Sequence, residues 1–253
     1  MSPPTNLLIT GANRGIGLGL IKKYLELPNH NIIAFVRDPS SGSSQALKTL
    51  KRDLTTNIIL IPYDASVWDS AAQAVKILTA EHNITHLNTV IANAGIAKIY
   101  PFIRDVNPAD IREHFEINVL GPVALFQATR DLLHASLEAT PEKKPIYAFM
   151  GSGAGLLEGG LDVPSAAYAP TKTMLNWYGM KLHGEEEWLV TFIIDPGWVR
   201  TDMGNAGAHA FGMEQANLEV EESVDGIFEV VKGATREREG GRLVEYTGRI
   251  EGW

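Results

Sequence analysis

Tyr168 and Lys172 are the two side chains of this sequence best suited to acid–base chemistry. Residues four apart on a helix share one face, so the phenol and the ammonium would lie close together. A nearby ammonium stabilises a phenolate and would lower the pKa of Tyr168 from its usual value of about 10. Such a tyrosine could act as a general acid near neutral pH. The same spacing also arises where a half-buried tyrosine lies beside a surface lysine.

Ser152 and Asn118 are two further polar residues in positions that call for an explanation. Ser152 follows a short apolar run, and its hydroxyl could hydrogen-bond a substrate oxygen on which negative charge develops. Asn118 lies inside a stretch of helical pattern, where its amide competes with the backbone for hydrogen bonds. The simpler alternatives are a loop serine and a polar residue that bridges two helices.

A glycine-rich segment, TGANRGIG at residues 10–17, follows the first apolar run and precedes a helical pattern. Gly11, Gly15 and Gly17 would let the chain turn tightly and let a diphosphate approach the N-terminus of the helix. A tight turn without any ligand is the alternative. The position directly after the first strand favours dinucleotide binding.

The elements that must position these residues are short strands alternating with longer amphipathic helices. The strands are apolar at consecutive positions, which indicates burial on both faces, as in a parallel sheet. We therefore predict an α/β fold with a doubly wound, mostly parallel seven-stranded sheet and helices on both faces. Ligands should bind at the carboxyl ends of the strands. The predicted strands are 6–10, 31–36, 58–63, 89–92, 146–150, 191–194 and 242–246, and the predicted helices are 16–27, 44–54, 67–82, 108–135, 167–183 and 220–234.

Composition narrows the classes of function. The 253 residues include no cysteine, which excludes disulfides, thiolate zinc sites and a cysteine nucleophile, and we expect no metal site. The net charge is −8 and no cluster of basic residues occurs, so we expect no nucleic-acid partner. No apolar stretch approaches the length of a membrane span, and the first ten residues lack the pattern of an export signal, so we expect a cytoplasmic protein.

Taken together and in order, these motifs resemble the short-chain dehydrogenase/reductase family in its single-domain form. The glycine loop, Asn93-Ala94-Gly95 after the fourth strand, Asn118, the Ser152–Tyr168–Lys172 set and Asp195-Pro196-Gly197 all follow the family's order. The resemblance covers essentially the whole chain. It implies a single NADP-binding Rossmann-type domain over residues 1–253 and a dehydrogenase or reductase acting on a carbonyl or alcohol group.

The resemblance also implies a role for each matching residue. Tyr168 would donate the proton to the carbonyl oxygen, Lys172 would lower its pKa and bind the nicotinamide ribose, and Ser152 would hold the carbonyl. Asn118 would anchor a water that links Lys172 to solvent. The cofactor would further be held by Gly11, Arg14, Gly15, Ile16, Gly17, Arg37, Asp64, Asn93, Pro196, Gly197, Val199 and Thr201.

The choice of cofactor can be argued from charge. Arg37 follows the second strand, where an acidic residue would repel a 2′-phosphate, and Arg14 lies inside the glycine loop. Two guanidiniums suit a phosphate, so we predict NADP(H) rather than NAD(H). Asp38 could reverse this preference if its carboxylate, and not Arg37, faces the ribose.

Three departures from the family pattern are visible. The segment between Ser152 and Tyr168 is longer than usual, and residues 158–164 are predicted to form a Gly-rich flap beside the substrate. Ala92 replaces the first asparagine of the usual Asn-Asn-Ala-Gly. Pro170 falls within the expected helix and is compatible with it only near the helix start.

A small-molecule carbonyl compound is the expected substrate. Apolar and aromatic residues fall in loops at the carboxyl ends of strands, which favours an apolar or aromatic compound; they are Ile96, Tyr100, Phe102, Leu156, Leu157, Trp198, Met203 and Phe211. A substrate lid is predicted around residues 203–217. The pattern is similar to carbonyl reductases and to fungal polyketide ketoreductases, which makes a secondary-metabolite intermediate one candidate.

Several alternatives stay open. A non-catalytic NADP-binding regulator would need only the glycine loop, and a cofactor-retaining isomerase or dehydratase would use the same fold. The family contains many dimers and tetramers, so a homodimer or homotetramer is open beside a monomer.

Overall fold

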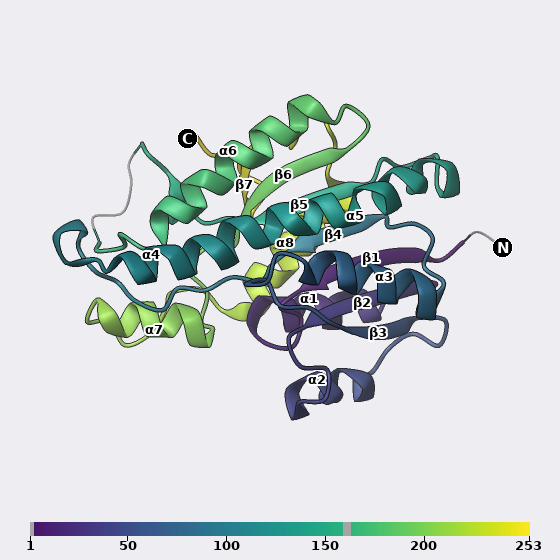
Figure 1. Ribbon diagram of the computed structural model, residues 1–253, viewed down its shortest axis with the longest axis horizontal. Coiled ribbons are helices and arrows are strands. Elements are labelled where there is room, and N and C mark those ends of the chain that lie inside the picture. Colours follow the sequence, from purple (N-terminus) through teal and green to yellow (C-terminus); the bar gives the residue numbers. More distant parts are fainter. Residues whose placement is uncertain (1–2, 159–162) are drawn as a thin grey trace.

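A parallel seven-stranded sheet in the order β3-β2-β1-β4-β5-β6-β7 forms the centre of the structure (Figure 1). The structure is a computed structural model that describes residues 3–158 and 163–253. In β1, Ile9 is aligned with Ala34 on one side and with Ile91 on the other. The strands are β1 (Thr5–Thr10), β2 (His30–Val36), β3 (Asn57–Pro62), β4 (Thr89–Ala92), β5 (Ile146–Met150), β6 (Val190–Asp195) and β7 (Leu243–Glu245).

Both faces of the sheet are buried, as the continuous apolar runs predict. In β1, Leu7 and Ile9 face a core formed with α1 and α8, whereas Leu8 faces a second core formed with α3, α5 and α6. Figure 1 shows α3, α5 and α6 in front of the sheet and α8 behind it. The predicted fold class is therefore confirmed.

The helices that cover the sheet mostly follow the prediction. The α-helices are α1 (Gly15–Leu25), α2 (Gly42–Ala46), α3 (Ser70–His82), α4 (Pro108–Phe115), α5 (Gly121–Ala139), α6 (Ala169–Glu185), α7 (Asp202–Ala210) and α8 (Val220–Gly233). None of the helices in the described part of the chain is long and apolar enough to cross a membrane.

Two helix predictions need correction. The helix predicted over 44–54 ends early, because α2 passes into a short 3₁₀ turn, Leu47–Thr49, after which the backbone of Leu50 is extended. The helix predicted over 108–135 is interrupted by a π-helical turn, Glu116–Leu120. Pro122 has no N–H to donate to the carbonyl of Asn118, which explains the change of hydrogen-bond pattern there.

The predicted lid, around residues 203–217, is partly helical. Its first half is α7, whose N-terminus is capped by Thr201 through a hydrogen bond from Gly204 N. All strands are parallel, so their carboxyl ends meet at one edge of the sheet, at the left of Figure 1, where α4 and α7 also lie. The strand order reverses between β1 and β4, and a ligand is expected to bind across this point.

Candidate active site

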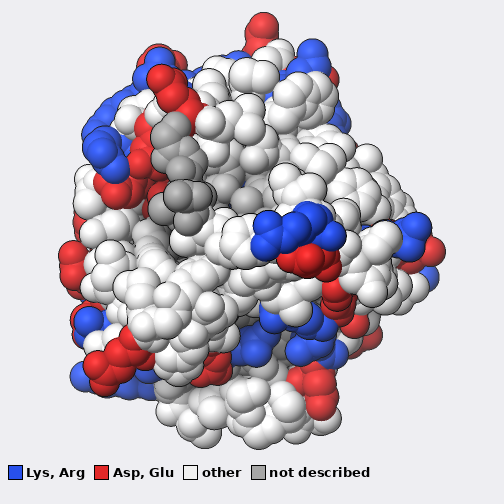
Figure 2. All heavy atoms as spheres, turned by 90° about the vertical axis from the view of Figure 1, so that its left-hand side faces the viewer, with Lys and Arg blue, Asp and Glu red and all other residues white. Residues whose placement is uncertain are grey.

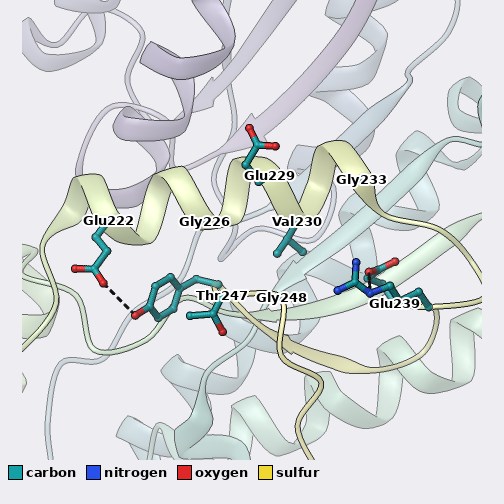
Figure 3. Close-up of a pocket in the computed structure, with 10 residues that line it drawn as sticks. Glu222, Gly226, Glu229, Val230, Gly233, Glu239, Thr247 and Gly248 are labelled. Atoms are coloured by element: carbon teal, nitrogen blue, oxygen red, sulfur yellow. Dashed lines mark hydrogen bonds and ion pairs between the residues drawn. The ribbon is translucent and has the colours of Figure 1, made fainter.

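A cavity, called the larger cavity below, lies at the carboxyl edge of the sheet. It measures about 720 Å³ and is lined by Ser152 after β5, Tyr168 before α6, and Pro196 and Gly197 after β6. Figure 2 faces this edge and shows a broad area of uncharged residues around its hollow centre. The smaller cavity, of about 280 Å³, lies between α8 and the turn after β7 (Figure 3). Tyr246 lines both cavities.

Ser152 and Tyr168 are brought together on the wall of the larger cavity. Both side chains line this cavity, although they come from different loops. The Ser152 Oγ also accepts a hydrogen bond from Ala154 N, which fixes the loop after β5. Pro170 lies in the first turn of α6, where its missing N–H costs no helical hydrogen bond. The departure at Pro170 therefore leaves Tyr168 in place.

Lys172 is buried one turn into α6. Its Nζ donates to the carbonyl oxygen of Met150 at 2.7 Å and lies 5.5 Å from the centre of the Tyr168 ring. A Cβ at Gly95 would lie 3.2 Å from Asn118 Oδ1 and 3.8 Å from Lys172 Nζ, so both side chains border the same small space.

Asn118 is fully buried in the π-helical turn. Its Oδ1 accepts from Ile96 N, and its Nδ2 donates to the carbonyl of Ile96 and to Thr171 Oγ1, at 2.8 to 3.1 Å. Asn118 therefore ties the loop after β4 to α6, and it also matches the simpler reading of a polar residue that joins two elements.

The pKa of Tyr168 departs from the expectation. Burial raises it, the hydrogen bond with Ser152 acts in the opposite direction, and the charge of Asp195 raises it further. Lys172 does not lower it, since the ammonium donates to the backbone of Met150 and burial lowers the pKa of Lys172 itself to about 8. Tyr168 therefore stays protonated to a higher pH than a free tyrosine, whereas Lys172 loses its proton at a lower pH than a free lysine.

The glycine loop takes the form required for a close approach to a ligand. Gly11 and Gly15 have φ values of +63° and +51°, which favour glycine. A Cβ at Gly17 would lie 2.4 Å from the carbonyl oxygen of Gly11, so no side chain fits there. Asn93 Nδ2 donates to the carbonyl of Thr10 at 2.8 Å and braces the loop against β4.

The segment after β6 closes against this loop. A Cβ at Gly15 would lie 3.2 Å from Thr201 Cγ2, so the two segments are in near contact. Ile16, Val199 and Thr201 line the larger cavity together with Pro196 and Gly197. The residues predicted to surround a dinucleotide at this end are therefore gathered around one space.

The arginines lie apart from this buried cluster. Arg14 and Arg37 are both exposed, at the ends of the neighbouring strands β1 and β2, and neither forms an ion pair with any residue of 3–158 or 163–253. The Asp38 carboxylate accepts hydrogen bonds from Ser40 N and Oγ, at 2.8 and 2.6 Å, and so is occupied within its own turn. Asp64 lies near Arg37: burial raises the pKa of its carboxyl, but hydrogen bonds from Ser66 and the charge of Arg37 lower it overall.

Fewer apolar residues line the larger cavity than predicted. Tyr100, Leu156, Trp198, Met203 and Phe211 line it, with the Phe211 ring 5.1 Å from Tyr100 and 6.0 Å from Trp198. Three predicted lining residues do not contribute. Phe102 is exposed beneath Arg104, Leu157 points into solvent, and Ile96 serves the Asn118 contact through its backbone. Of the predicted flap, Val163 lines the cavity, and residues 159–162 lie outside the described residues.

Four lining residues carry acid or phenol groups that the sequence reasoning missed: Asp195, Glu222, Glu245 and Tyr246. Asp195 was visible as part of Asp-Pro-Gly, but nothing in that motif assigns its side chain a partner. The others come from α8 and from β7 with its following turn, which only the folded sheet brings to this edge.

Comparison with known proteins agrees with this geometry. A profile of the family described as short chain dehydrogenase matches residues 5–211. Norsolorinic acid ketoreductase nor1 of Dothistroma septosporum is 38% identical over 96% of this chain and 90% of its own length. Norsolorinic acid ketoreductase of Aspergillus parasiticus is 35% identical over 97% of this chain and 90% of its own length.

Solved structures give the same result. NADPH-bound carbonyl reductase from chicken fatty liver has a TM-score of 0.86 and 26% identity, covering 99% of this chain and all of its own. Carbonyl reductase Sniffer of D. melanogaster has a TM-score of 0.86 and 25% identity over the same shares of the two chains. The likeness thus extends over the whole sheet and its surrounding helices.

Proposed function

The chain belongs to the short-chain dehydrogenase family, and from this premise we propose that it is an NADPH-dependent ketoreductase with Tyr168 as its proton donor. One observation carries the proposal. Ser152 and Tyr168 both line the larger cavity, and Lys172 Nζ lies 5.5 Å from the centre of the tyrosine ring. A carbonyl oxygen bound between them would contact both hydroxyls at once.

The residues around the glycine loop fit a dinucleotide. Gly15 and Gly17 place no side chain of their own at the N-terminus of α1, and none would fit at Gly17. Backbone N–H groups at such a terminus bind a diphosphate favourably. NADPH, when bound, supplies the hydride for carbonyl reduction. Gly11, Ile16, Asn93, Pro196, Gly197 and Val199 would complete its site, and Asp64 would accept from the adenine amino group.

The proton step follows from the pKa of Tyr168. Because burial raises that pKa, the phenol is protonated at neutral pH. Ser152 holds the carbonyl oxygen, so that negative charge developing there meets two hydroxyl donors. Tyr168 then gives its proton to that oxygen, and the centre of its ring lies 5.5 Å from Lys172 Nζ.

Lys172 and Asn118 provide the route for reprotonation. Both side chains border the space beside Gly95, where a Cβ would lie 3.2 Å from Asn118 Oδ1 and 3.8 Å from Lys172 Nζ. Asn118 Oδ1 can accept a hydrogen bond from a water there, and the water can exchange a proton with Lys172. A lysine whose pKa lies at about 8 suits this task, because it gains and releases protons readily near neutral pH.

The preference for NADPH is proposed from two exposed guanidiniums. Arg14 and Arg37 form no ion pair in the described part of the chain, although the charge of Arg37 acts on Asp64, whereas Asp38 is engaged by Ser40. A 2′-phosphate would give the arginines charge-assisted hydrogen bonds. The NADPH in the chicken carbonyl reductase structure supports the same choice.

An aromatic ketone is the substrate class that the cavity wall favours. Tyr100, Trp198 and Phe211 offer ring edges and faces to a flat apolar molecule, and α7 carries Met203 beside them. The named activity of the fungal relatives is reduction of norsolorinic acid, which supports a secondary-metabolite intermediate. The segment around 203–217 would act as the lid over this substrate.

A panel of aromatic and aliphatic ketones and aldehydes, followed by NADPH absorbance, tests the proposal. We expect oxidation of NADPH with aromatic ketones and much slower oxidation of NADH. Tight NADPH binding without oxidation on any member would instead indicate a regulator. Conversion of a substrate without net NADPH consumption would indicate an isomerase or a dehydratase.

A further inference from the structure

The loop after β4, residues 93–102, forms part of the wall of the larger cavity, since Ala97 and Tyr100 line that cavity. Three of its backbone N–H groups, at alternate positions, donate to side chains: Ala94 N to Thr10 Oγ1 at 2.9 Å, Ile96 N to Asn118 Oδ1 at 2.8 Å and Lys98 N to His114 Nε2 at 3.1 Å. Alternate N–H groups of an extended chain point the same way, so side chains hold this edge of the loop as a neighbouring strand would. Asn118 already has a part in the proposed reaction, whereas His114 has none.

His114 lies on α4, four residues before Asn118, and is fully buried. Its Nδ1 lies 2.7 Å from the carbonyl oxygen of Asp110, and its Nε2 lies 3.1 Å from Lys98 N. A carbonyl oxygen can only accept a hydrogen bond and a backbone N–H can only donate one. The two partners therefore fix the state of the ring: Nδ1 carries the proton, Nε2 is the acceptor and the imidazole is neutral.

The contact at Lys98 lies two residues before Tyr100, whose ring must fit closely against α7. A Cβ at Gly207 would lie 3.0 Å from the Tyr100 hydroxyl, and the Phe211 ring lies 5.1 Å from that of Tyr100. Lys98 Nζ also forms an ion pair with Glu113, but both side chains are about half exposed and such pairs contribute little. The backbone contact is therefore the stronger restraint on this part of the wall.

We propose that His114 is a positioning residue of the substrate site. Its neutral imidazole holds the loop at Lys98 through Nε2 and so sets where Tyr100 meets the substrate. The inference rests on the proposed function, since it takes a ketone as the ligand of this wall. Protonation or loss of Nε2 would leave the Lys98 N–H without its acceptor and release the loop between Ile96 and Tyr100.

Two amide variants that differ only in reach test the contact. His114→Gln places an oxygen near the position of Nε2 and keeps an acceptor for Lys98 N, whereas His114→Asn reaches only as far as Nδ1. We expect His114→Asn to raise KM for aromatic ketones about fivefold and to change kcat less than about twofold, because Ser152 and Tyr168 lie on other segments. His114→Gln should keep KM within about twofold of the wild type. His82→Asn, an exposed control, should match the wild type.

The pattern of the two variants decides the kinetic test. An unchanged KM in His114→Asn, an equal rise of KM in His114→Gln, or a fall in kcat without a rise in KM would overturn the proposal.

NMR of the ¹⁵N-labelled wild type provides a measurement that needs no variant and no substrate. At neutral pH we expect a ¹⁵N–¹⁵N coupling across the hydrogen bond from Lys98 N to His114 Nε2, and a proton on Nδ1 of the same ring. A proton on Nε2, or a charged ring, would overturn the proposal. A protein that shows the coupling but reduces no ketone would refute the proposed function alone, so the two failures are distinguishable.

Discussion

Two clusters at the carboxyl edge of the sheet differ in how firmly their side chains are held. Tyr168 and Lys172 are packed into the protein, Lys172 is hydrogen-bonded to the backbone of Met150, and burial shifts the pKa values of both residues. Arg14 and Arg37 are exposed and form no ion pair in the described ranges, although the charge of Arg37 acts on Asp64. The first cluster is organised before any ligand arrives, whereas the second gains its contacts only from a ligand.

The two clusters should therefore respond to mutation in different ways. Preorganised donors lower the barrier of the chemical step, so changes there should reduce kcat. Free surface charges contribute to binding and to discrimination between ligands, so changes there should alter KM and cofactor preference. Each prediction below tests one side of this contrast, beginning with the largest effect.

Replacement of the proton donor should have the largest effect. We expect Tyr168→Phe to lower kcat about a thousandfold, because the developing charge on oxygen loses its acid, while the Kd for NADPH changes little. Steady-state kinetics together with a fluorescence titration of NADPH measure both quantities. Tyr178→Phe, on the same helix but outside the cavity, is the control and should retain activity. Equal losses of kcat and NADPH affinity in Tyr168→Phe would contradict the proposed difference between the two clusters.

Reversal of charge at the exposed cluster should act on preference instead. Arg37→Asp should shift the NADPH/NADH ratio of kcat/KM about a hundredfold toward NADH, because a charge-assisted hydrogen bond is replaced by repulsion of the 2′-phosphate. Arg52→Asp, another exposed arginine in a loop, should leave the ratio unchanged. An unchanged ratio in Arg37→Asp would refute the argument from charge, and a large fall in kcat with NADH would contradict the separation of the clusters.

The two clusters should also differ in their response to pH: kcat should change with pH, whereas NADPH affinity should not. Burial lowers the pKa of Lys172 to about 8, so its ammonium loses a proton as pH rises through that value, and kcat for reduction should then fall by up to about tenfold per pH unit. Tyr168 does not account for this limb, since its pKa is raised. NADPH affinity should stay constant over the same range, because guanidiniums remain charged. A rate profile that is flat to about pH 10 would contradict the assignment to Lys172.

The smallest effect is expected in the apolar wall. Phe211→Leu removes a ring that packs against Tyr100 and Trp198, and it should raise KM for aromatic ketones about fivefold while sparing small aliphatic ones. Phe102→Leu, whose ring lies outside the cavity, is the matched control. Steady-state kinetics of both variants with aromatic and with aliphatic ketones would show which of the two rings contacts the substrate. An equal effect of the two variants would place Phe211 outside it.

The fold was largely predictable because it depends on patterns that are local in the sequence. Continuous apolar strands predict burial on both faces, and Leu7 and Leu8 do pack into opposite cores. Errors arose where the backbone changes locally: the chain after α2 leaves the helix at Leu50, and a π-helical turn that holds Asn118 precedes Pro122. Neither effect is visible in apolar periodicity.

The site was predictable only as far as its motifs reach. Gly11, Gly15 and Gly17 take the conformations that their spacing implies. The pKa of Tyr168 was not predictable, because it depends on burial and on the direction in which Lys172 points. Glu222, Glu245 and Tyr246 were not predictable as lining residues, because only the folded sheet brings α8 and β7 to this edge.

Transfer of deuterium from NADPH labelled at C4 of the nicotinamide tests the central claim most directly. With an aromatic ketone that the wild type consumes, we predict one deuterium at the carbinol carbon of the product, and about a thousandfold slower transfer in Tyr168→Phe. Product that forms without deuterium, or transfer at the wild-type rate in Tyr168→Phe, would contradict the account.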